Sequence, residues 1–224
     1  MSDSKKDCVV AIDGPAGSGK STVSKLVAKK LGFLYVDTGA MYRALTLKAM
    51  RNNIKMDEEA ALIELSKNTK IDLEDAEAGL KVYLEGEDVS KEIRTPRVTN
   101  NVFYVARIPG VREEMVKLQR HVSRKADVVL EGRDIGTVVF PDAQYKFYLD
   151  AGFDERVRRR YGDLVRDKHN MTIEQVAKDL KERDDKDLTR KVAPLKKADD
   201  AELVDTTNMT IDDVVGYIAS RIKK

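Results

Sequence analysis

The sequence contains no tryptophan, one cysteine and two histidines among its 224 residues. A lone cysteine, Cys8, cannot close a disulfide within the chain, and so few histidines and cysteines cannot supply the clustered ligands of a structural zinc site. The polar N-terminus leads into an apolar run of only five residues, Cys8 to Ile12. This run is too short for a signal peptide or a membrane span. We therefore expect a cytoplasmic protein with no membrane partner.

An excess of charge of one sign is also missing. The chain has 41 Lys and Arg against 39 Asp and Glu, which gives a formal net charge of +2. This balance creates no global field that would attract nucleic acid or a membrane surface. With 42% hydrophobic residues, the chain is long enough for one core of ordinary size and a small appendage. We expect one main domain.

The chain opens with a pattern typical of a strand, a loop, a helix and a second strand. The β-rich run that starts at Cys8 ends at Asp13, and apolar residues then recur at helical spacing from Val23 to Leu31. Gly32 can end this helix, and Leu34 to Val36 reads as a second strand. The sequence therefore predicts a βαβ unit at its start.

Three further apolar strands, Val128 to Leu130, Tyr145 to Leu149 and Leu203 to Val204, are separated by long polar segments of helical character. This pattern is typical of a buried parallel sheet flanked by helices. Between Lys70 and Arg94 polar and apolar residues alternate instead, with Gly79 and Gly86 as turns, which predicts a small antiparallel excursion.

The remaining segments have helical patterns. Pro96 and Pro109 bracket one helical segment, and an amphipathic pattern follows from Val111 to about Lys125. Thr172 and Thr210 are predicted N-caps of two later helices.

Residues 14 to 21, GPAGSGKS, match the phosphate-binding pattern G-x-x-x-x-G-K-[ST] between a predicted strand and a predicted helix. The glycines let backbone N–H groups surround a phosphate, and the helix N-terminus adds positive charge. Lys20 is expected to reach the β- and γ-phosphates, Ser21 to coordinate Mg²⁺, and Thr22 to lie nearer the α-phosphate. The predicted ATP-binding residues are Gly14, Pro15, Ala16, Gly17, Ser18, Gly19, Lys20, Ser21 and Thr22.

This P-loop alone does not identify the acceptor, because ATPases, GTPases and kinases share it. The guanine-binding tetrapeptide N-K-x-D is absent from the sequence, which disfavours a GTPase. The segment DTGAMYR, 37 to 43, follows the second strand directly, and LEGRDIG, 130 to 136, follows another buried strand. Both segments are expected at the carboxyl edge of the sheet beside the P-loop.

Within the first of these segments Thr38 can cap the next helix, and Arg43 projects from its first turns. With Arg133 from the second segment, two arginines converge where a γ-phosphoryl group is delivered. Either Asp37 or Glu131 could orient the acceptor or the waters of the metal, and the residues do not choose between them.

A third charged segment, 182 to 190, continues the helix that Thr172 begins. Arg183, Asp187 and Arg190 stand at positions i, i+4 and i+7 and share one face. That row of charges suits a phosphate and a ribose hydroxyl, whereas a solvated face of i,i+4 ion pairs is the alternative.

A fourth cluster comprises Arg156, Arg158, Arg159, Arg160 and Arg166, on a segment with few apolar residues. We expect a weakly packed cationic lid that excludes water and places arginines on the transferring phosphoryl group. The predicted catalytic residues are Lys20, Arg133, Arg183, Arg190 and, from the lid, Arg159.

Taken together, these segments resemble the bacterial cytidylate kinases, nucleoside monophosphate kinases related to adenylate kinase. Beyond the P-loop, the resemblance rests on DTGAMYR at 37–43, PGVREEMVKLQR at 109–120, EGRDIGTVVFPDA at 131–143, ERDDKDLTR at 182–190 and APL at 193–195. It covers almost the whole chain. It implies an α/β fold: a P-loop kinase core with a five-stranded parallel sheet flanked by helices, an acceptor-binding domain with a small antiparallel insertion, and a short lid.

The resemblance also implies one domain with three functional regions. The core would comprise 1–37, 109–152 and 192–224, the acceptor-binding region with its insertion 38–108, and the lid with the charged helix 153–191.

The same resemblance assigns roles to acceptor residues. Thr38, Arg43 and Arg133 would hold the phosphate of the acceptor, and Arg112 with Asp134 would read the cytosine. The counterpart of Asp187 binds ribose hydroxyls, and Arg183 and Arg190 would bind ribose and phosphate. Where many relatives carry a serine that touches the base, this chain carries Phe103, and Thr99 is the nearest hydroxyl on that helix.

The implied reaction transfers the γ-phosphoryl group of ATP, with Mg²⁺, to CMP and dCMP. The enzyme is expected to be a monomer with no nucleic-acid partner. One alternative is a P-loop kinase for another small acceptor, such as a different nucleoside monophosphate or shikimate. A second is a P-loop protein that binds nucleic acid, suggested by the arginine run from 156 to 166, although this run lacks an aromatic stripe.

Overall fold

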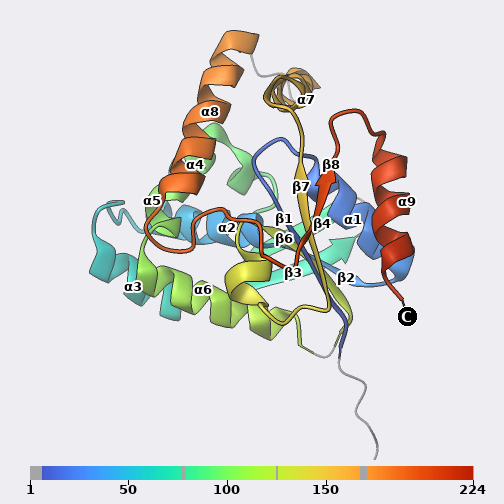
Figure 1. Ribbon diagram of the computed structural model, residues 1–224. Coiled ribbons are helices and arrows are strands. Elements are labelled where there is room, and N and C mark those ends of the chain that lie inside the picture. Colours follow the sequence, from blue (N-terminus) through green and yellow to red (C-terminus); the bar gives the residue numbers. More distant parts are fainter. Residues whose placement is uncertain (1–6, 77–78, 125, 167–170, 224) are drawn as a thin grey trace, which may run out of the picture. The chain divides into compact units, whose positions relative to one another are not determined.

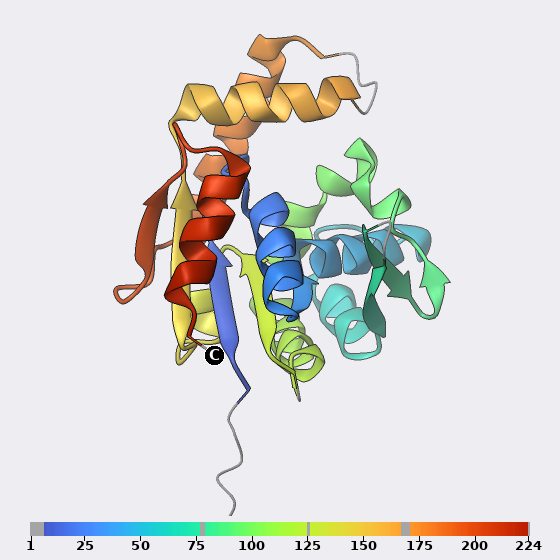
Figure 2. The same cartoon turned by 90° about the vertical axis from the view of Figure 1, so that its right-hand side faces the viewer.

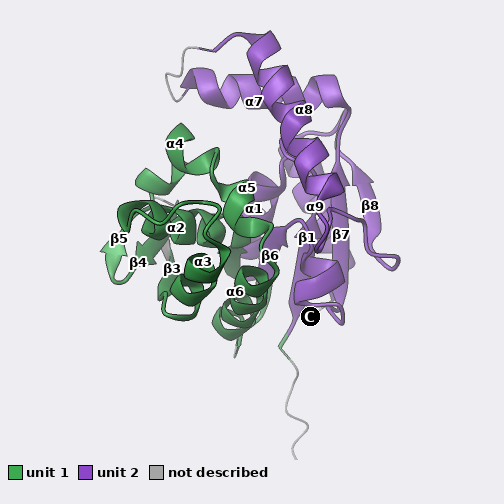
Figure 3. Cartoon of the chain, turned by 90° about the vertical axis from the view of Figure 1, so that its left-hand side faces the viewer, with its two compact units in different colours: residues 1–7, 34–128 green, residues 8–33, 129–224 purple. Residues whose placement is uncertain are grey.

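The computed structural model describes residues 7–76, 79–124, 126–166 and 171–223. The other positions include the predicted helix end near Lys125 and part of the predicted lid, 167–170, which lie outside the described residues. The chain divides into two compact units, shown in Figure 3. Unit 1 comprises residues 1–7 and 34–128, and unit 2 comprises 8–33 and 129–224. These units are compact bodies of the fold, and the division into core, acceptor-binding region and lid stays a prediction about function.

A five-stranded sheet has the order β2-β6-β1-β7-β8 (Figure 1). Its strands are β1 (Val9–Asp13), β2 (Leu34–Asp37), β6 (Val128–Gly132), β7 (Tyr145–Asp150) and β8 (Glu202–Asp205). β1 pairs in parallel with β7, which pairs in parallel with β8 on its other side. Four of the five residues of β1 and all five of β6 are buried, as expected for strands that are covered on both faces. The predicted parallel α/β fold is confirmed.

Helices of unit 2 follow the predicted pattern. α1 (Lys20–Leu31) ends at Gly32, whose positive φ of 70° suits the left-handed conformation of a C-cap. α9 (Ile211–Arg221) is capped by Thr210 and packs against α1 (Figure 2). After β6 the chain forms a single π-helical turn, η2 (Ile135–Val139). This turn starts directly beyond Arg133 and Asp134, so it follows the segment that carries predicted site residues.

The predicted lid is better packed than its charge suggests. α7 (Phe153–Arg166) and α8 (Ile173–Thr189, capped by Thr172) bury a small apolar cluster together with Ala16 of the P-loop. The buried members are Ala16, Val157, Val176 and Leu180, with Tyr161, Leu164, Met171 and Ala177 packed against them. The expectation of a weakly packed segment is therefore wrong. The helix also ends at Thr189, so Arg190 is its C-cap in extended conformation rather than a helical residue.

Unit 1 contains the antiparallel excursion. β3 (Ile71–Ala76), β4 (Gly79–Leu84) and β5 (Glu87–Asp88) form an antiparallel sheet with a turn at Gly86, where φ is 86°. The antiparallel excursion is thus confirmed, but Gly79 is the first residue of β4 rather than a turn residue, and the turn positions 77–78 lie outside the described residues. The extended pattern also ends before η1 (Glu92–Arg94), which is a 3₁₀ turn.

The helices of unit 1 differ from the prediction between the two prolines. Two short helices, α4 (Pro96–Thr99) and α5 (Val102–Ala106), replace the single predicted segment, so Thr99 and Phe103 stand on different helices. Pro109 opens α6 (Pro109–Val122) at its first turn, where its missing N–H costs nothing. The unit is completed by α2 (Thr38–Arg51) and α3 (Glu59–Lys67). Among the described residues, the helices are too short or too polar to span a bilayer.

Candidate functional site

The P-loop connects the end of β1 to the start of α1 in a conformation that requires glycine. Gly14, Gly17 and Gly19 have φ angles of 149°, 76° and 88°. A Cβ at Gly14 would lie 2.0 Å from the carbonyl oxygen of Leu149, so no other residue fits there. The sequence prediction of a strand, a phosphate loop and a helix is borne out in its local structure.

Lys20 is the first residue of α1 and is buried, with 5% of its surface exposed. Its Nζ donates hydrogen bonds to the carbonyl oxygen of Pro15 at 2.6 Å and to Ser18 Oγ at 3.3 Å. Burial and, after it, the nearby Arg133 guanidinium lower the pKa of Lys20 to about 7, while Glu131 opposes them. The ammonium is therefore held in an environment that favours an added anion.

The first turn of α1 presents hydroxyl groups to solvent. Ser21 and Thr22 are both exposed beside the buried Lys20. Among the described residues no group of three or more His, Cys, Asp and Glu side chains could hold a metal ion. A serine hydroxyl beside a phosphate loop fits Mg²⁺ that arrives with a nucleotide, because Mg²⁺ prefers oxygen ligands and keeps several waters.

Five of the predicted acceptor residues belong to unit 2. Arg133 Nε donates to Asp187 Oδ2 at 2.7 Å, and this pair joins the end of β6 to α8. The side chain of Asp187 is only 16% exposed, which contradicts a solvated helix face at this position. Burial opposes its ionisation most strongly, but Arg133, Arg183 and Arg190 together outweigh burial and lower the pKa of Asp187.

The second contact of this group joins Asp134 to Arg190. Arg190 Nη2 lies 3.7 Å from Asp134 Oδ1, and its Nε donates to the carbonyl oxygen of Ala193 at 2.5 Å. Arg183 contributes to the electrostatics of both Lys20 and Asp187. The structure thus brings Arg133, Asp134, Arg183, Asp187 and Arg190 together in unit 2, where Lys20 also lies.

The other three predicted acceptor residues, Thr38, Arg43 and Arg112, belong to unit 1. Asp37, rather than Thr38, caps α2: its Oδ1 accepts from the backbone N–H of Ala40 at 2.8 Å, and Thr38 is the first helical residue. The expectation that Thr38 caps this helix is therefore wrong, because a carboxylate one residue earlier reaches the free N–H groups.

Asp37 also carries two basic neighbours. Arg43 Nη2 donates to Asp37 Oδ2 at 3.0 Å, and Arg94 Nη2 lies 4.0 Å from the same oxygen. Burial opposes ionisation of Asp37 most strongly, but Arg43, the backbone N–H of Ala40 and Arg94 together outweigh burial and lower the pKa of this carboxyl. Arg94, from the 3₁₀ turn η1, is a cation at this position that the sequence reasoning missed.

Arg112 is buried on α6, with 4% of its surface exposed. Its Nη1 donates to the carbonyl oxygen of Ala106 at 3.0 Å, and its guanidinium lies over the ring of Tyr42, 5.6 Å from the centroid. The hydrogen bond to Ala106 fixes one edge of the Arg112 guanidinium, and the ring of Tyr42 fixes one of its faces. A buried guanidinium held in this way suits hydrogen bonds of defined geometry to a ligand.

Of the lid arginines, Arg159 is held beside Gly19 of the P-loop. Its guanidinium donates to Thr206 Oγ1 at 2.9 Å and to the carbonyl oxygen of Thr206 at 2.6 Å. A Cβ placed at Gly19 would lie 3.7 Å from Arg159 Nη1. By contrast, the side chains of Arg158 and Arg166 are exposed and pair with acids on their own helix.

Arg156 has a structural role that the sequence did not reveal. It is buried, and its Nη1 donates to the carbonyl oxygen of Ala16 at 3.0 Å and to Asp184 Oδ2 at 2.5 Å. This side chain therefore ties α7 to the P-loop and to α8.

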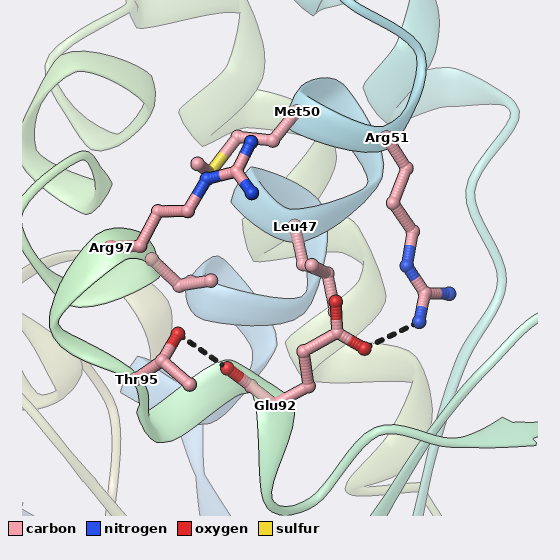
Figure 4. Close-up of a pocket in the computed structure, with 7 residues that line it drawn as sticks. Leu47, Met50, Arg51, Glu92, Thr95 and Arg97 are labelled. Carbon is pink, nitrogen blue, oxygen red and sulfur yellow. Dashed lines mark hydrogen bonds and ion pairs between the residues drawn. The ribbon is translucent and has the colours of Figure 1, made fainter.

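A pocket of about 380 Å³ lies in unit 1, between the end of α2 and the turn that precedes α4 (Figure 4). Arg51 at its edge donates to Glu92, and Thr95 donates to the carbonyl oxygen of Glu92. None of the predicted substrate residues lines it. The lining residues are Leu47, Met50, Arg51, Glu92, Thr95, Arg97 and Val98.

Comparison with known proteins identifies the family. The family model for cytidylate kinase matches residues 10–224. The chain belongs to the cytidylate kinase family. It is 51% identical over 216 residues to a cytidylate kinase of Fusobacterium nucleatum, covering 96% of this chain and 97% of that protein. It is 54% identical over 217 residues to a cytidylate kinase of Desulforamulus reducens, with 96% of each chain covered.

One solved structure adds a likeness of fold to this membership in the cytidylate kinase family. The crystal structure of an uncharacterized protein from Eubacterium ventriosum matches with a TM-score of 0.53 and 12% identity, over 96% of this chain and 98% of that chain. At this identity the likeness concerns the fold alone.

Proposed function

We propose that this protein transfers the γ-phosphoryl group of ATP to CMP and dCMP, giving CDP and dCDP. The observation that carries the proposal is the arrangement within unit 2: a P-loop with a buried Lys20 and the Arg133–Asp187 pair. Membership in the cytidylate kinase family supports the choice of acceptor. The enzyme would act in the cytoplasm as a monomer, without a nucleic-acid or membrane partner.

On the donor side, residues 14–22 would bind the phosphates of ATP. Backbone N–H groups of the loop and the N-terminus of α1 supply positive potential, and Lys20 supplies a full charge. Binding an anion would let Lys20 exchange its contact with Pro15 for a phosphate oxygen. Ser21 would hold Mg²⁺, which neutralises charge on the phosphates when it is bound with ATP.

On the acceptor side, the charged residues divide by task. Thr38, Arg43 and Arg133 would hold the phosphate of CMP, and Arg112 with Asp134 would recognise the cytosine by complementary donors and acceptors. Asp187 would accept hydrogen bonds from ribose hydroxyls while Arg183 and Arg190 bind ribose and phosphate.

The chemical step needs no side-chain nucleophile. Phosphoryl transfer is accelerated mainly by holding the two reactants in line and by stabilising the charge of the transferring group. Lys20, Arg133, Arg183, Arg190 and Arg159 are the cations that we assign to this task. Regions 153–191 and 38–108 would act as lid and acceptor-binding region around the remaining core.

A coupled assay that follows ADP formation tests the proposal, with CMP, dCMP, UMP, AMP and shikimate compared as acceptors at fixed ATP and Mg²⁺. We expect the highest kcat/KM with CMP or dCMP. Consumption of AMP or shikimate at least as efficient as that of CMP would overturn the acceptor assignment.

A further inference from the structure

The carboxylate of Asp13 links two distant parts of unit 2. Asp13 is the last residue of β1, directly before the P-loop, and is 5% exposed. Its Oδ1 accepts from the backbone N–H of Ile135 at 2.8 Å, and its Oδ2 accepts from the backbone N–H of Gly136 at 2.8 Å. The two partners lie 122 and 123 residues further along the chain. Both oxygens are therefore used to hold one loop, the start of η2.

An ionised carboxylate offers both oxygens as full acceptors in this geometry. An amide would turn its NH₂ group, which can only donate, toward one of the two backbone N–H groups, and a protonated carboxyl would leave a weaker acceptor at one of its two oxygens. The loop leaves little space for another arrangement, since a Cβ at Gly136 would lie 3.3 Å from the Lys146 side chain and 3.5 Å from Asp13 Oδ2. Inside a protein an unmatched donor of this kind is costly.

The residues just before the held amides are Arg133 and Asp134. Arg133 donates to Asp187, and Asp134 lies 3.7 Å from Arg190. The carbonyl oxygen of Asp134 also accepts from the N–H of Val138 at 2.9 Å. Anchoring residues 135 and 136 consequently fixes the backbone from which two proposed acceptor-binding side chains project.

We propose that Asp13 is a positioning residue for acceptor recognition, which holds Arg133 and Asp134 in register through the amides of Ile135 and Gly136. This inference rests on the proposed function. It assigns to Asp13 no contact with either substrate. Asp13 should therefore affect CMP binding and base selectivity, and leave ATP binding largely unchanged.

The ionisation of Asp13 supports a measurable consequence. Burial raises the pKa of Asp13 to about 6, although both backbone amides lower it, so this carboxyl protonates in mildly acidic solution. Protonation weakens one of the two acceptors. The charged or titratable groups that interact with it are Lys20 from α1, Asp134 beyond β6 and Tyr148 from β7.

The first test is Asp13→Asn, which keeps the size of the side chain and removes one acceptor. We expect KM for CMP to rise by about tenfold and the CMP/UMP ratio of kcat/KM to fall, with KM for ATP within about twofold of wild type. The matched control is Asp213→Asn on α9, since this carboxylate also accepts a backbone N–H, that of Thr210, but within its own turn. An unchanged KM for CMP together with an unchanged CMP/UMP ratio would overturn the inference.

The second test uses the wild-type enzyme and needs no variant to fold. The CMP/UMP ratio of kcat/KM is measured from pH 7.5 to pH 5.5, because the two acceptors share the ionisation of their phosphate, near pH 6, and it cancels in the ratio. We expect the ratio to fall in wild type as Asp13 protonates, and to stay flat in Asp13→Asn. A flat ratio in wild type would contradict the proposed role.

Amide hydrogen exchange separates this inference from the proposed function. Faster exchange at Ile135 and Gly136 in Asp13→Asn is expected without any substrate present. If wild type phosphorylates CMP and exchange rises while CMP discrimination is unchanged, positioning by Asp13 is wrong. If wild type does not phosphorylate CMP, the proposed function fails, and the positioning role fails with it, even where the exchange data show that Asp13 holds the loop.

Discussion

At the scale of single residues, the buried charge of Lys20 lowers the stability of the fold at the position where we propose that it binds phosphate. The Lys20 ammonium is buried beside Arg133, and its pKa is lowered to about 7. The charged form of Lys20 therefore destabilises the folded state. A lysine that is fully solvated in the unfolded chain titrates near 10.4. The stability penalty is therefore complete below pH 7 and declines as the pH rises from about 7 toward 10.

Lys20→Met is the corresponding prediction. Turnover should fall by roughly two orders of magnitude or more, because one preorganised cation is lost from the phosphoryl-transfer site. The ligand-free variant should nevertheless melt at a higher temperature than wild type at pH 7, and the difference should shrink toward pH 9. Steady-state assays and thermal melts measure the two effects. Lys29→Met, on the exposed face of α1, is the control, and near-wild-type turnover of Lys20→Met would refute the catalytic role.

Asp187 allows a prediction that separates a substrate contact from a structural ion pair. Because its carboxylate holds Arg133 at 2.7 Å, its removal should affect the acceptor side alone. We expect Asp187→Ala to raise KM for CMP by about tenfold or more, with little change in KM for ATP.

The exposed Asp185 lies on the same helix, and Asp185→Asn should change neither constant. Steady-state kinetics with each substrate varied in turn decide the question. Equal effects of Asp187→Ala on both substrates would contradict an acceptor-specific role.

At the scale of secondary-structure elements, the buried Arg156 connects two helices, α7 and α8, with the P-loop. Its guanidinium bonds to Ala16 of the P-loop and to Asp184 of α8, while its own backbone belongs to α7. Gly17 is fitted against the same residue, because a Cβ there would lie 3.0 Å from the carbonyl oxygen of Arg156. A shift of α7 would thus be transmitted directly to the P-loop.

Removing this arginine should destabilise the protein rather than simply loosen a lid. Arg156→Met leaves Asp184 buried without its partner, which typically costs about 3 kcal/mol. The double variant Arg156→Met with Asp184→Leu should recover most of this loss. Arg158→Met, which removes an exposed i,i+3 pair, should cost under about 1 kcal/mol. Denaturant unfolding of the three proteins measures these values, and equal losses for the two single variants would contradict the burial argument.

Elements were predictable where the signal was local. Strands, the P-loop and the caps at Thr172 and Thr210 depend on short patterns of apolar, glycine and hydroxyl residues, and all were found in the structure. The packing of the lid was missed because its charge concealed a stripe: Val157, Tyr161 and Leu164 stand at i, i+4 and i+7. The bonds of Asp13 had no local signal at all, since its partners are backbone amides more than a hundred residues away.

At the scale of the whole molecule, most of the basic side chains that suggested a nucleic-acid surface are already in use. Arg156 and Arg159 are held by Asp184, Thr206 and Glu155, and the exposed Arg158 and Arg166 are neutralised by acids one turn away. Nucleic-acid affinity depends on cations that can release the counterions of several phosphates. The net charge of +2 gives no additional attraction at a distance.

We therefore expect no saturable binding of single-stranded RNA at physiological salt. Any retention at low salt should vanish steeply as salt is raised and should not depend on sequence, because it would come from screened surface charge alone. Filter binding from about 20 to 200 mM salt measures this, with Arg160→Ala as a probe of the basic helix. Tight retention at the higher salt that Arg160→Ala weakens would favour the nucleic-acid alternative, because cations on α7 would then contact phosphates directly. We also expect an excess of RNA to leave CMP kinase activity unchanged, because RNA that does not bind at the nucleotide site cannot compete with the substrates.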